Sequence, residues 1–332
     1  MHTEARSQPT EPEGQPDSPS LPNSDAHLAC HFQLNADWLS YPASDAPVAL
    51  SISVRGRGAG DDDRLRQVKD RYNGFAGTYL SGRQALPFAG LRSTPAETLV
   101  RNVLPAEMFT GPNVRWDDAG WSERFADCVA TVCCERGARL LHLDEIVHPS
   151  SGGTTVAWHK TCAHVKRITD RLHCVGCAVV ANVAGSPWIW SRADGDRLAD
   201  ACDGVSLEAP FFASDTSDPR FGRRPERVRR ELAAYRRWLD AGLTIVLVPQ
   251  YGEPQVEQRV CAALLLMIRR PGDRCFVHRE FWADCPDWDA WPAALGDALG
   301  PCRQDEGVWS RTFECGSLHV EPAASHVDVQ IR

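Results

Sequence analysis

Two acidic side chains at the ends of apolar segments are the residues best suited to chemistry. One apolar run ends at Asp144 and Glu145, and the segment DGVSLE (203–208) ends at Glu208 in the same way. Short apolar runs of this kind are typical of buried strands. Two carboxyl groups in one pocket can serve as proton donor and as nucleophile or base, because like charges keep one of them protonated. We take Asp144, with Glu145 as its alternative, and Glu208 as candidate catalytic residues.

Strand-like and helical patterns alternate along most of the chain and predict an α/β fold. About eight alternations over roughly 250 residues, with strands apolar throughout, fit a (β/α)8 TIM barrel whose active site lies at the carboxyl ends of the strands. An open doubly wound sheet is the alternative, although RGRGAG (55–60) has neither dinucleotide-binding nor P-loop spacing. The expected strands are 47–54, 75–80, 102–109, 138–143, 177–183, 204–208, 243–249 and 274–281, and the expected helices are 61–72, 94–102, 121–137, 155–172, 192–201, 224–242 and 253–270.

Composition divides the chain of 332 residues into three regions. Residues 1–27 are rich in Pro, Ser and acidic residues and have little to bury, so we expect a disordered tail. Residues 28–300 hold the alternating segments and form the expected barrel domain. Residues 301–332 alternate apolar and polar residues around turn-like breaks, which predicts a small C-terminal antiparallel β appendage.

Four segments of the chain resemble glycosyl-hydrolase-like TIM-barrel proteins. Strands in that family read DGVxLD and DGVxLE, and its tails read RxFxNGxVxVNP. The resemblance spans residues 47–332, implies a carbohydrate substrate, and puts Asp144 at the first acid and Glu208 at the second. The segments that carry it are RLLHLDEI (139–146), CDGVSLEAPF (202–211), LTIVLVPQYG (243–252) and VWSRTFECGSLHVEP (308–322).

The chain departs from the family pattern in three places. RLLHL replaces the DGV before Asp144, and Cys315 and Glu321 stand where the family has Asn. We therefore expect a glycoside hydrolase that uses two carboxyl groups, with a carbohydrate-binding barrel protein without turnover as the alternative. The roles of Glu208 as general acid/base and Asp144 as nucleophile or general base could be reversed, and retention or inversion depends on their separation.

Other residues near strand ends would line the same mouth. Polar donors suit sugar hydroxyls, and aromatic faces suit the C–H surfaces of sugar rings. Trp188 and Trp190 are the candidates for stacking, with covering of the barrel rim as the alternative role. The expected substrate-binding residues are Arg55, Tyr79, Asn182, Trp188, Trp190, Gln250, Tyr251 and Arg279.

One short segment, 158–177, is rich in metal-ligand types and favours a zinc-binding protein as a weaker alternative. A zinc site usually needs two close ligand pairs, and the CxxC has no thioredoxin-like surroundings, so we expect no metal and no cofactor. No GxSxG motif supports a serine hydrolase. The possible ligands are His159, Cys162, His164, His173, Cys174 and Cys177.

Charge and hydropathy restrict the partners. A net charge of -8 disfavours nucleic acid and anionic lipid, which need a basic surface. No segment reaches about 18 consecutive apolar residues, and the N-terminus lacks the pattern of a signal peptide. Most of the 13 cysteines lie in apolar or helical patterns, where thiols behave as small hydrophobes, so we expect a cytoplasmic protein with reduced thiols. No pattern indicates the sugar or the oligomeric state.

Overall fold

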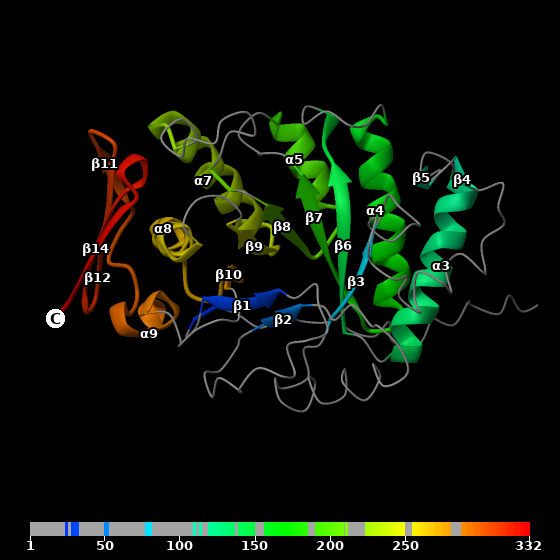
Figure 1. The fold of residues 1–332 in the computed structure, drawn as a ribbon, viewed down its shortest axis with the longest axis horizontal. Coiled ribbons are helices and arrows are strands. Elements are labelled where there is room, and N and C mark those ends of the chain that lie inside the picture. The colour runs from blue at the N-terminus through cyan, green and yellow to red at the C-terminus, as the bar shows by residue number, and fades with distance from the viewer. Residues whose placement is uncertain are drawn as a thin grey trace, which may run out of the picture.

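A parallel sheet with helices along one face, and a second, antiparallel sheet beside it, make up most of the described structure (Figure 1). The expected α/β class is therefore confirmed. This computed structural model describes residues 24–25, 28–32, 50–52, 77–81, 109–110, 113–114, 119–136, 139–149, 156–184, 190–208, 210–211, 223–249, 254–279 and 287–332.

The parallel sheet has eight strands in the order β2-β1-β10-β9-β8-β7-β6-β3. β1 lies between β2 and β10, and from β10 the strands continue in reverse chain order to β3. With β2 and β3 at the two edges, this is the cyclic order found in a (β/α)8 barrel. Among the described residues no ladder joins β2 to β3. The strands are β1 (Ala29–Phe32), β2 (Leu50–Ile52), β3 (Gly77–Ser81), β6 (Leu140–Val147), β7 (Ala178–Ala184), β8 (Gly204–Glu208), β9 (Thr244–Val248) and β10 (Cys275–Arg279).

Amphipathic helices cover one face of this sheet. In α7 the buried Val228, Leu232, Tyr235 and Leu239 recur at helical spacing, and the helix begins with Pro225 at a first-turn position. Helix α4 contacts β7, α7 contacts β9, and α8 contacts β10 (Figure 1). The helices are α3 (Ala119–Arg136), α4 (Trp158–His173), α5 (Arg192–Ala199), α7 (Pro225–Asp240), α8 (Pro254–Ile268) and α9 (Trp291–Leu295), with short 3-10 turns η5 (Asp287–Ala290) and η6 (Pro322–Ala324).

Successive residues of the strands face opposite sides of the sheet. Leu141, Val179 and Leu207 belong to the large core beneath the helices, whereas Leu140 and Val180 belong to a separate, smaller cluster on the other face. Both faces are buried, which explains why the strands are apolar throughout. The remaining members of the smaller cluster are Cys30, Ala178, Val246, Val248 and Phe276.

The order of the early strands differs from the sequence prediction. The sequence analysis missed β1, and the segment 102–109 was expected to be the third strand. Phe109–Thr110 (β4) instead pairs antiparallel with Asn113–Val114 (β5), and 102–108 lie outside the described residues. The third strand of the sheet in chain order is β3, so Asp144 still lies on the fourth strand and Glu208 on the sixth.

The Asp-Gly pair at the start of β8, residues 203–204, joins three strands and a helix. The carboxylate of Asp203 accepts hydrogen bonds from the Val179 N–H at 2.8 Å and lies 2.9 Å from Nε2 of His173. The Asp203 carbonyl accepts the Thr244 N–H at 2.9 Å. At Gly204 a Cβ atom would lie 2.8 Å from the Thr244 carbonyl oxygen, so only glycine fits beside β9.

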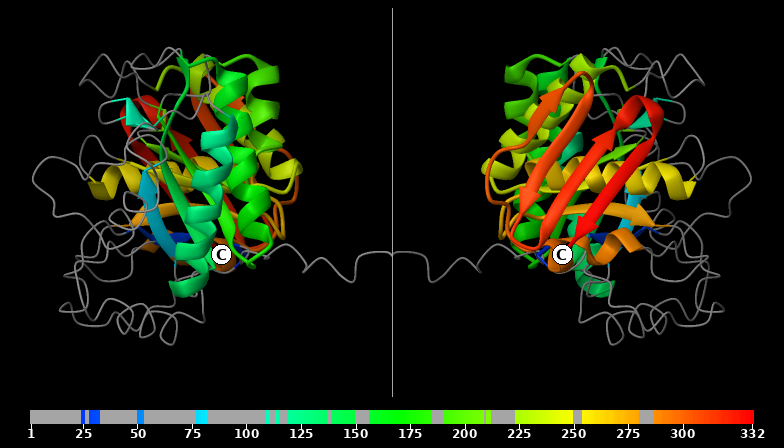
Figure 2. Two further views of the ribbon diagram at one scale, coloured as in Figure 1. Left: turned by 90° about the vertical axis from the view of Figure 1, so that its right-hand side faces the viewer. Right: turned by 90° about the vertical axis from the view of Figure 1, so that its left-hand side faces the viewer.

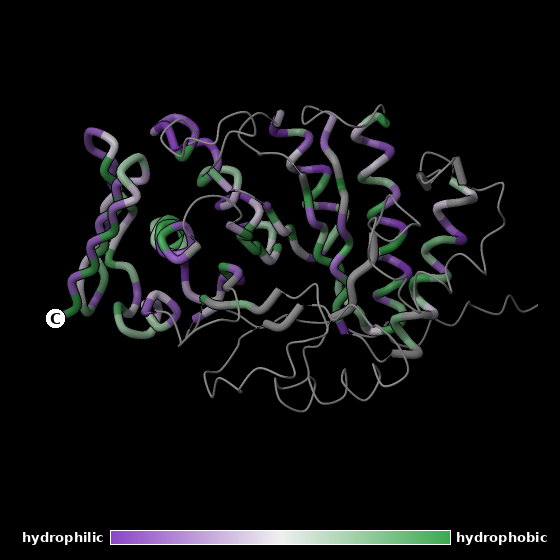
Figure 3. Tube along the Cα trace, viewed as in Figure 1, coloured by the Kyte–Doolittle hydropathy of each residue, from purple (hydrophilic) through white to green (hydrophobic). Residues whose placement is uncertain are grey.

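The second sheet covers the outer side of α8, as the right-hand view of Figure 2 shows. Residues 260–267 of α8 are all buried, and Figure 3 shows the helix as largely apolar. A helix that is apolar on all sides must be covered on all sides. Trp309, Phe313, Leu318 and Val320 of the second sheet belong to the same core cluster. Its strands are β11 (Arg303–Asp305), β12 (Val308–Phe313), β13 (Gly316–Glu321) and β14 (His326–Ile331).

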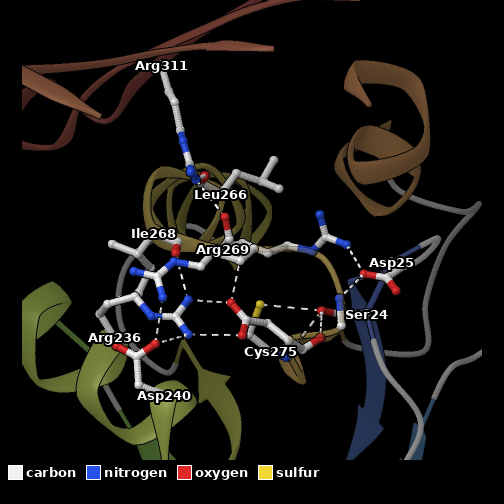
Figure 4. A network of polar contacts seen from close by, with 12 residues as sticks. Ser24, Asp25, Arg236, Asp240, Leu266, Ile268, Arg269, Cys275 and Arg311 are labelled. Carbon is white, nitrogen blue, oxygen red and sulfur yellow. Dashed lines mark hydrogen bonds and ion pairs between the residues drawn. The ribbon is translucent and has the colours of Figure 1, made fainter. Parts of the chain in front are cut away.

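A polar network at the amino-terminal end of β10 joins residues 24–25, which precede β1, to the segment before β10 (Figure 4). Ser24 Oγ donates to the Asp273 carbonyl at 2.8 Å, and the Cys275 N–H donates back to Ser24 Oγ at 3.2 Å. Arg236 binds the Asp273 carboxylate, and Arg269 binds Asp25 at 2.5 Å. Ser24 and Asp25, which precede β1, are thus tied to the segment before β10 and to Arg269. The boundaries of the three expected regions stay predictions.

None of the described helices combines the length and apolar character that crossing a membrane requires.

Candidate active site

Three neighbouring strands bring two carboxylates and one amide together. Asn182 lies on β7, between Asp144 on β6 and Glu208 on β8. Asn182 Nδ2 donates one hydrogen bond to Asp144 Oδ1 at 2.6 Å and another to Glu208 Oε1 at 2.8 Å. The two acids therefore share the Asn182 amide nitrogen as a hydrogen-bond donor.

A β-bulge interrupts β6 directly after Leu143. Leu143 and Ile146 pair with Ala181 and Val183 of β7. The two β6 residues are three positions apart, whereas their β7 partners are two positions apart. Leu143 and Ile146 therefore both pack in the helix-side core, which strict alternation would forbid. Asp144 binds Asn182 on the opposite face.

The shared amide also limits how far apart the carboxylates lie. The distance between Asp144 Oδ1 and Glu208 Oε1 cannot exceed the sum of the two hydrogen-bond lengths, about 5.4 Å. Both acids are half-buried, while Asn182 is 4% exposed. Hydrogen bonds to a carboxylate favour its charged form, so the amide opposes the repulsion between the two acids.

A neutral imidazole lies beside this pair. His142, two residues before Asp144 on β6, is fully buried. Burial lowers the pKa of His142 from 6.5 to about 4, and the negative charge of Asp144 opposes that shift. At neutral pH the site therefore contains a neutral imidazole and no buried positive charge from this residue.

The fold of the chain is similar to solved structures, although no family model and no curated protein matches its sequence. Amy13B of Eubacterium rectale aligns with 91% of this chain and 88% of its own, with a TM-score of 0.51 and 8% identity. An alpha-amylase from Malbranchea cinnamomea aligns with 90% of this chain and 85% of its own, at TM-score 0.48 and 9% identity. A GH18 chitinase from Pseudoalteromonas aurantia covers 79% and 97%, at TM-score 0.48 and 10% identity.

The likeness is one of fold. Glycoside hydrolases are among these neighbours. At 9% and 10% sequence identity, the similarity is limited to the arrangement of helices and strands.

Of the other expected binding residues, Trp190 lies away from the shared amide. Its ring is 9% exposed, stacks on His148 with centroids 4.7 Å apart, and contacts Trp158 at 5.3 Å. Trp190 thus packs within the helix-side core. Tyr79 pairs in register with His142. The side chains of Glu145, Tyr79 and Arg279, and the whole of Arg55, Trp188, Gln250 and Tyr251, lie outside the described residues.

The metal-ligand types of segment 158–177 have separate surroundings. Burial lowers the pKa of His164 to about 3, and its Nδ1 lies 2.7 Å from Ser122 Oγ. His173 binds Asp203, and burial raises the pKa of Cys162 to about 12. Within the described part of the chain no group of three or more His, Cys, Asp or Glu side chains could hold a metal ion.

The sequence analysis missed His142 and Ser206, which lie on the same face of the sheet as the acids. Ser206 pairs in register with Asn182 and is fully buried. The signal was available, because each lies two residues before an expected catalytic acid and side chains two apart share a face.

Proposed function

We propose that the protein is a glycoside hydrolase whose two catalytic carboxyl groups belong to Asp144 and Glu208, on a sheet that closes into a (β/α)8 barrel. The barrel is supported by the circular strand order and by the likeness to Amy13B of Eubacterium rectale. The observation that carries the function is the pair of hydrogen bonds from Asn182 Nδ2 to both acids.

The spacing favours hydrolysis with retention of anomeric configuration. Retaining enzymes hold the two carboxyl groups about 5–5.5 Å apart, whereas inverting enzymes leave roughly 6.5–9.5 Å for a water molecule. The upper limit of about 5.4 Å between the two bonded oxygens agrees with the shorter spacing.

In the proposed reaction Glu208, protonated, donates its proton to the glycosidic oxygen while the Asp144 carboxylate attacks the anomeric carbon. The leaving group departs as an alcohol, and a covalent glycosyl ester remains on Asp144. Glu208, now ionised, removes a proton from water, whose oxygen attacks the same carbon and frees Asp144. Both carboxyl groups end in their starting protonation states.

A screen on aryl glycosides and polysaccharides tests the proposal. Asp144→Asn and Glu208→Gln should each abolish turnover. Asp170→Asn and Glu226→Gln, at exposed positions on α4 and α7, should leave turnover unchanged. Proton NMR of the first product should show the substrate's anomeric configuration. Turnover that survives both site substitutions would remove these acids from the mechanism, and sugar binding without turnover by the wild type would favour a binding protein.

Azide distinguishes the two roles. With an activated aryl glycoside, azide should rescue Asp144→Ala by forming a glycosyl azide of inverted configuration, because azide attacks in place of the missing nucleophile. In Glu208→Ala it should form the azide of retained configuration by attacking the glycosyl ester. The opposite pairing of products would exchange the two assignments.

A further inference from the structure

The chain leaves β8 through a backbone conformation that side chains rarely adopt. Phe211, three residues after Glu208, has φ of 65°, in the left-handed region that a bulky residue enters only when its surroundings impose it. Phe211 is fully buried. Contacts in this part of the fold must therefore hold the exit of the strand in place.

One buried carboxylate makes the main polar contact. Glu231 Oε2 accepts the Phe211 N–H at 2.8 Å, and the Glu231 side chain is fully buried on α7. The same carboxylate accepts Arg227 Nε at 2.9 Å and the Tyr235 hydroxyl at 2.9 Å. A carboxylate with three donors on two segments links the exit of β8 rigidly to α7.

Packing reinforces this link. Arg227, Glu231 and Tyr235 follow one another at intervals of four residues on one side of α7. The rings of Phe211 and Tyr235 meet edge to face with centroids 5.8 Å apart. Burial, and then the charge of Glu231, raises the pKa of Tyr235 well above its usual value, which keeps the hydroxyl protonated as a donor.

We propose that Glu231 is a positioning residue for Glu208, an inference that rests on the proposed glycosidase function. Glu208 must stay within hydrogen-bonding distance of Asn182, now 2.8 Å, while it transfers its proton. Misplacement of a reacting group by about 1 Å can lower a rate by about 100-fold. By holding Phe211 in place, Glu231 fixes the position of the carboxyl end of β8, which carries Glu208.

The test replaces the buried ion pair without leaving a buried charge. The double variant Arg227→Met/Glu231→Met substitutes apolar side chains of similar size, an exchange that buried ion pairs often tolerate. Tyr235→Phe is the matched control, since it removes another hydrogen bond to the same carboxylate oxygen and keeps the bond from Phe211.

Amide exchange gives the first readout, and it is independent of any activity. Exchange at the Phe211 amide should accelerate about tenfold or more in the double variant and stay near the wild-type rate in Tyr235→Phe. The ¹³C NMR titration midpoint of the Glu208 carboxyl should also move in the double variant alone. Unchanged exchange or an unchanged midpoint in the double variant would overturn the proposal.

Kinetics give the second readout, on an aryl glycoside that the wild type cleaves. In the double variant kcat should fall about tenfold or more with KM within about twofold, while Tyr235→Phe keeps its kcat. A wild-type kcat in the double variant would overturn the positioning role while leaving the glycosidase proposal intact. A wild type that cleaves no glycoside would instead overturn the proposed function.

Discussion

At the scale of single residues, the amide of Asn182 is the centre of the candidate site. Its one nitrogen donates to both acids, so the side chain limits their separation. Sequence alone placed Asn182 among sugar-binding residues. The structure adds contacts to the two acids, which require the three strands to be neighbours.

Asn182→Ala should lower kcat/KM by about 100-fold, the effect of losing the alignment of a reacting group. The two carboxyl groups would lose the hydrogen bonds that align them, so the loss should appear mainly in kcat. Ser206→Ala is the control, because its buried hydroxyl has no hydrogen-bond partner among the described residues. A kcat/KM of Asn182→Ala within about twofold of the wild type would contradict this role.

His142 should make stability depend on pH. Its folded-state pKa is lowered to about 4 from 6.5, so between these values the unfolded chain binds more protons and stability falls as pH falls. From pH 7 to pH 5 this one group should cost about 2 kcal/mol of unfolding free energy. Urea unfolding at both pH values should show a smaller loss in His142→Leu, whereas His159→Gln, exposed on α4, should keep the wild-type loss.

At the scale of elements, close approach between strands explains a glycine that the family resemblance pointed to. Gly204 opens β8 where a side chain would meet the backbone of Thr244 on β9. Asp203 beside it ties β7, β9 and α4 together through its carboxylate and carbonyl. The Asp-Gly pair therefore serves the amino-terminal end of the sheet, and the acid that ends the same strand serves the opposite end.

Gly204→Ala should destabilise the protein by about 1–3 kcal/mol, the usual cost of extra atoms in a packed interior. The new Cβ would lie 2.8 Å from the Thr244 carbonyl oxygen, which is held in the sheet and cannot move aside cheaply. Gly300→Ala is the matched control, since no atom lies within 4 Å of a Cβ built there. Equal urea midpoints for the two variants would contradict the close-approach explanation.

At the scale of the whole molecule, the second sheet completes the burial of α8. Arg311 on β12 donates to the Leu266 and Arg269 carbonyls, both at 2.7 Å, and to the Gly300 carbonyl at 3.0 Å. Arg223, before α7, pairs with Glu257 of α8 and donates to Ser325 Oγ at 2.5 Å. These contacts tie the second sheet to α8 and to the start of α7, so we expect the two sheets to unfold together.

Arg311→Met should lower the free energy of unfolding by about 2 kcal/mol, because the carbonyls at the end of α8 lose their donor. Unfolding in urea should remain one transition, coincident by circular dichroism and tryptophan fluorescence. Arg303→Met, at an exposed position on β11, should leave the midpoint unchanged. Two separated transitions in the wild type would show that the sheets unfold independently.

The sequence by itself determined the local patterns. Apolar runs ending at Asp144 and Glu208 predicted strands that end in acids, and the pattern of 224–242 predicted the helix observed as α7, because such patterns are properties of short segments. The short strand β1 was missed, since ACHF (29–32) is too brief to show a period. Its absence from the count was offset by the third strand expected at 102–109.

Only the tertiary structure decided which groups meet. Asp144, Asn182 and Glu208 meet because β6, β7 and β8 are neighbours in the sheet and the three side chains lie on the same face. The left-handed turn at Phe211 and its bond to Glu231 join segments twenty residues apart. Register and long-range hydrogen bonds arise from how strands and helices pack, and neither leaves a periodic trace in the chain.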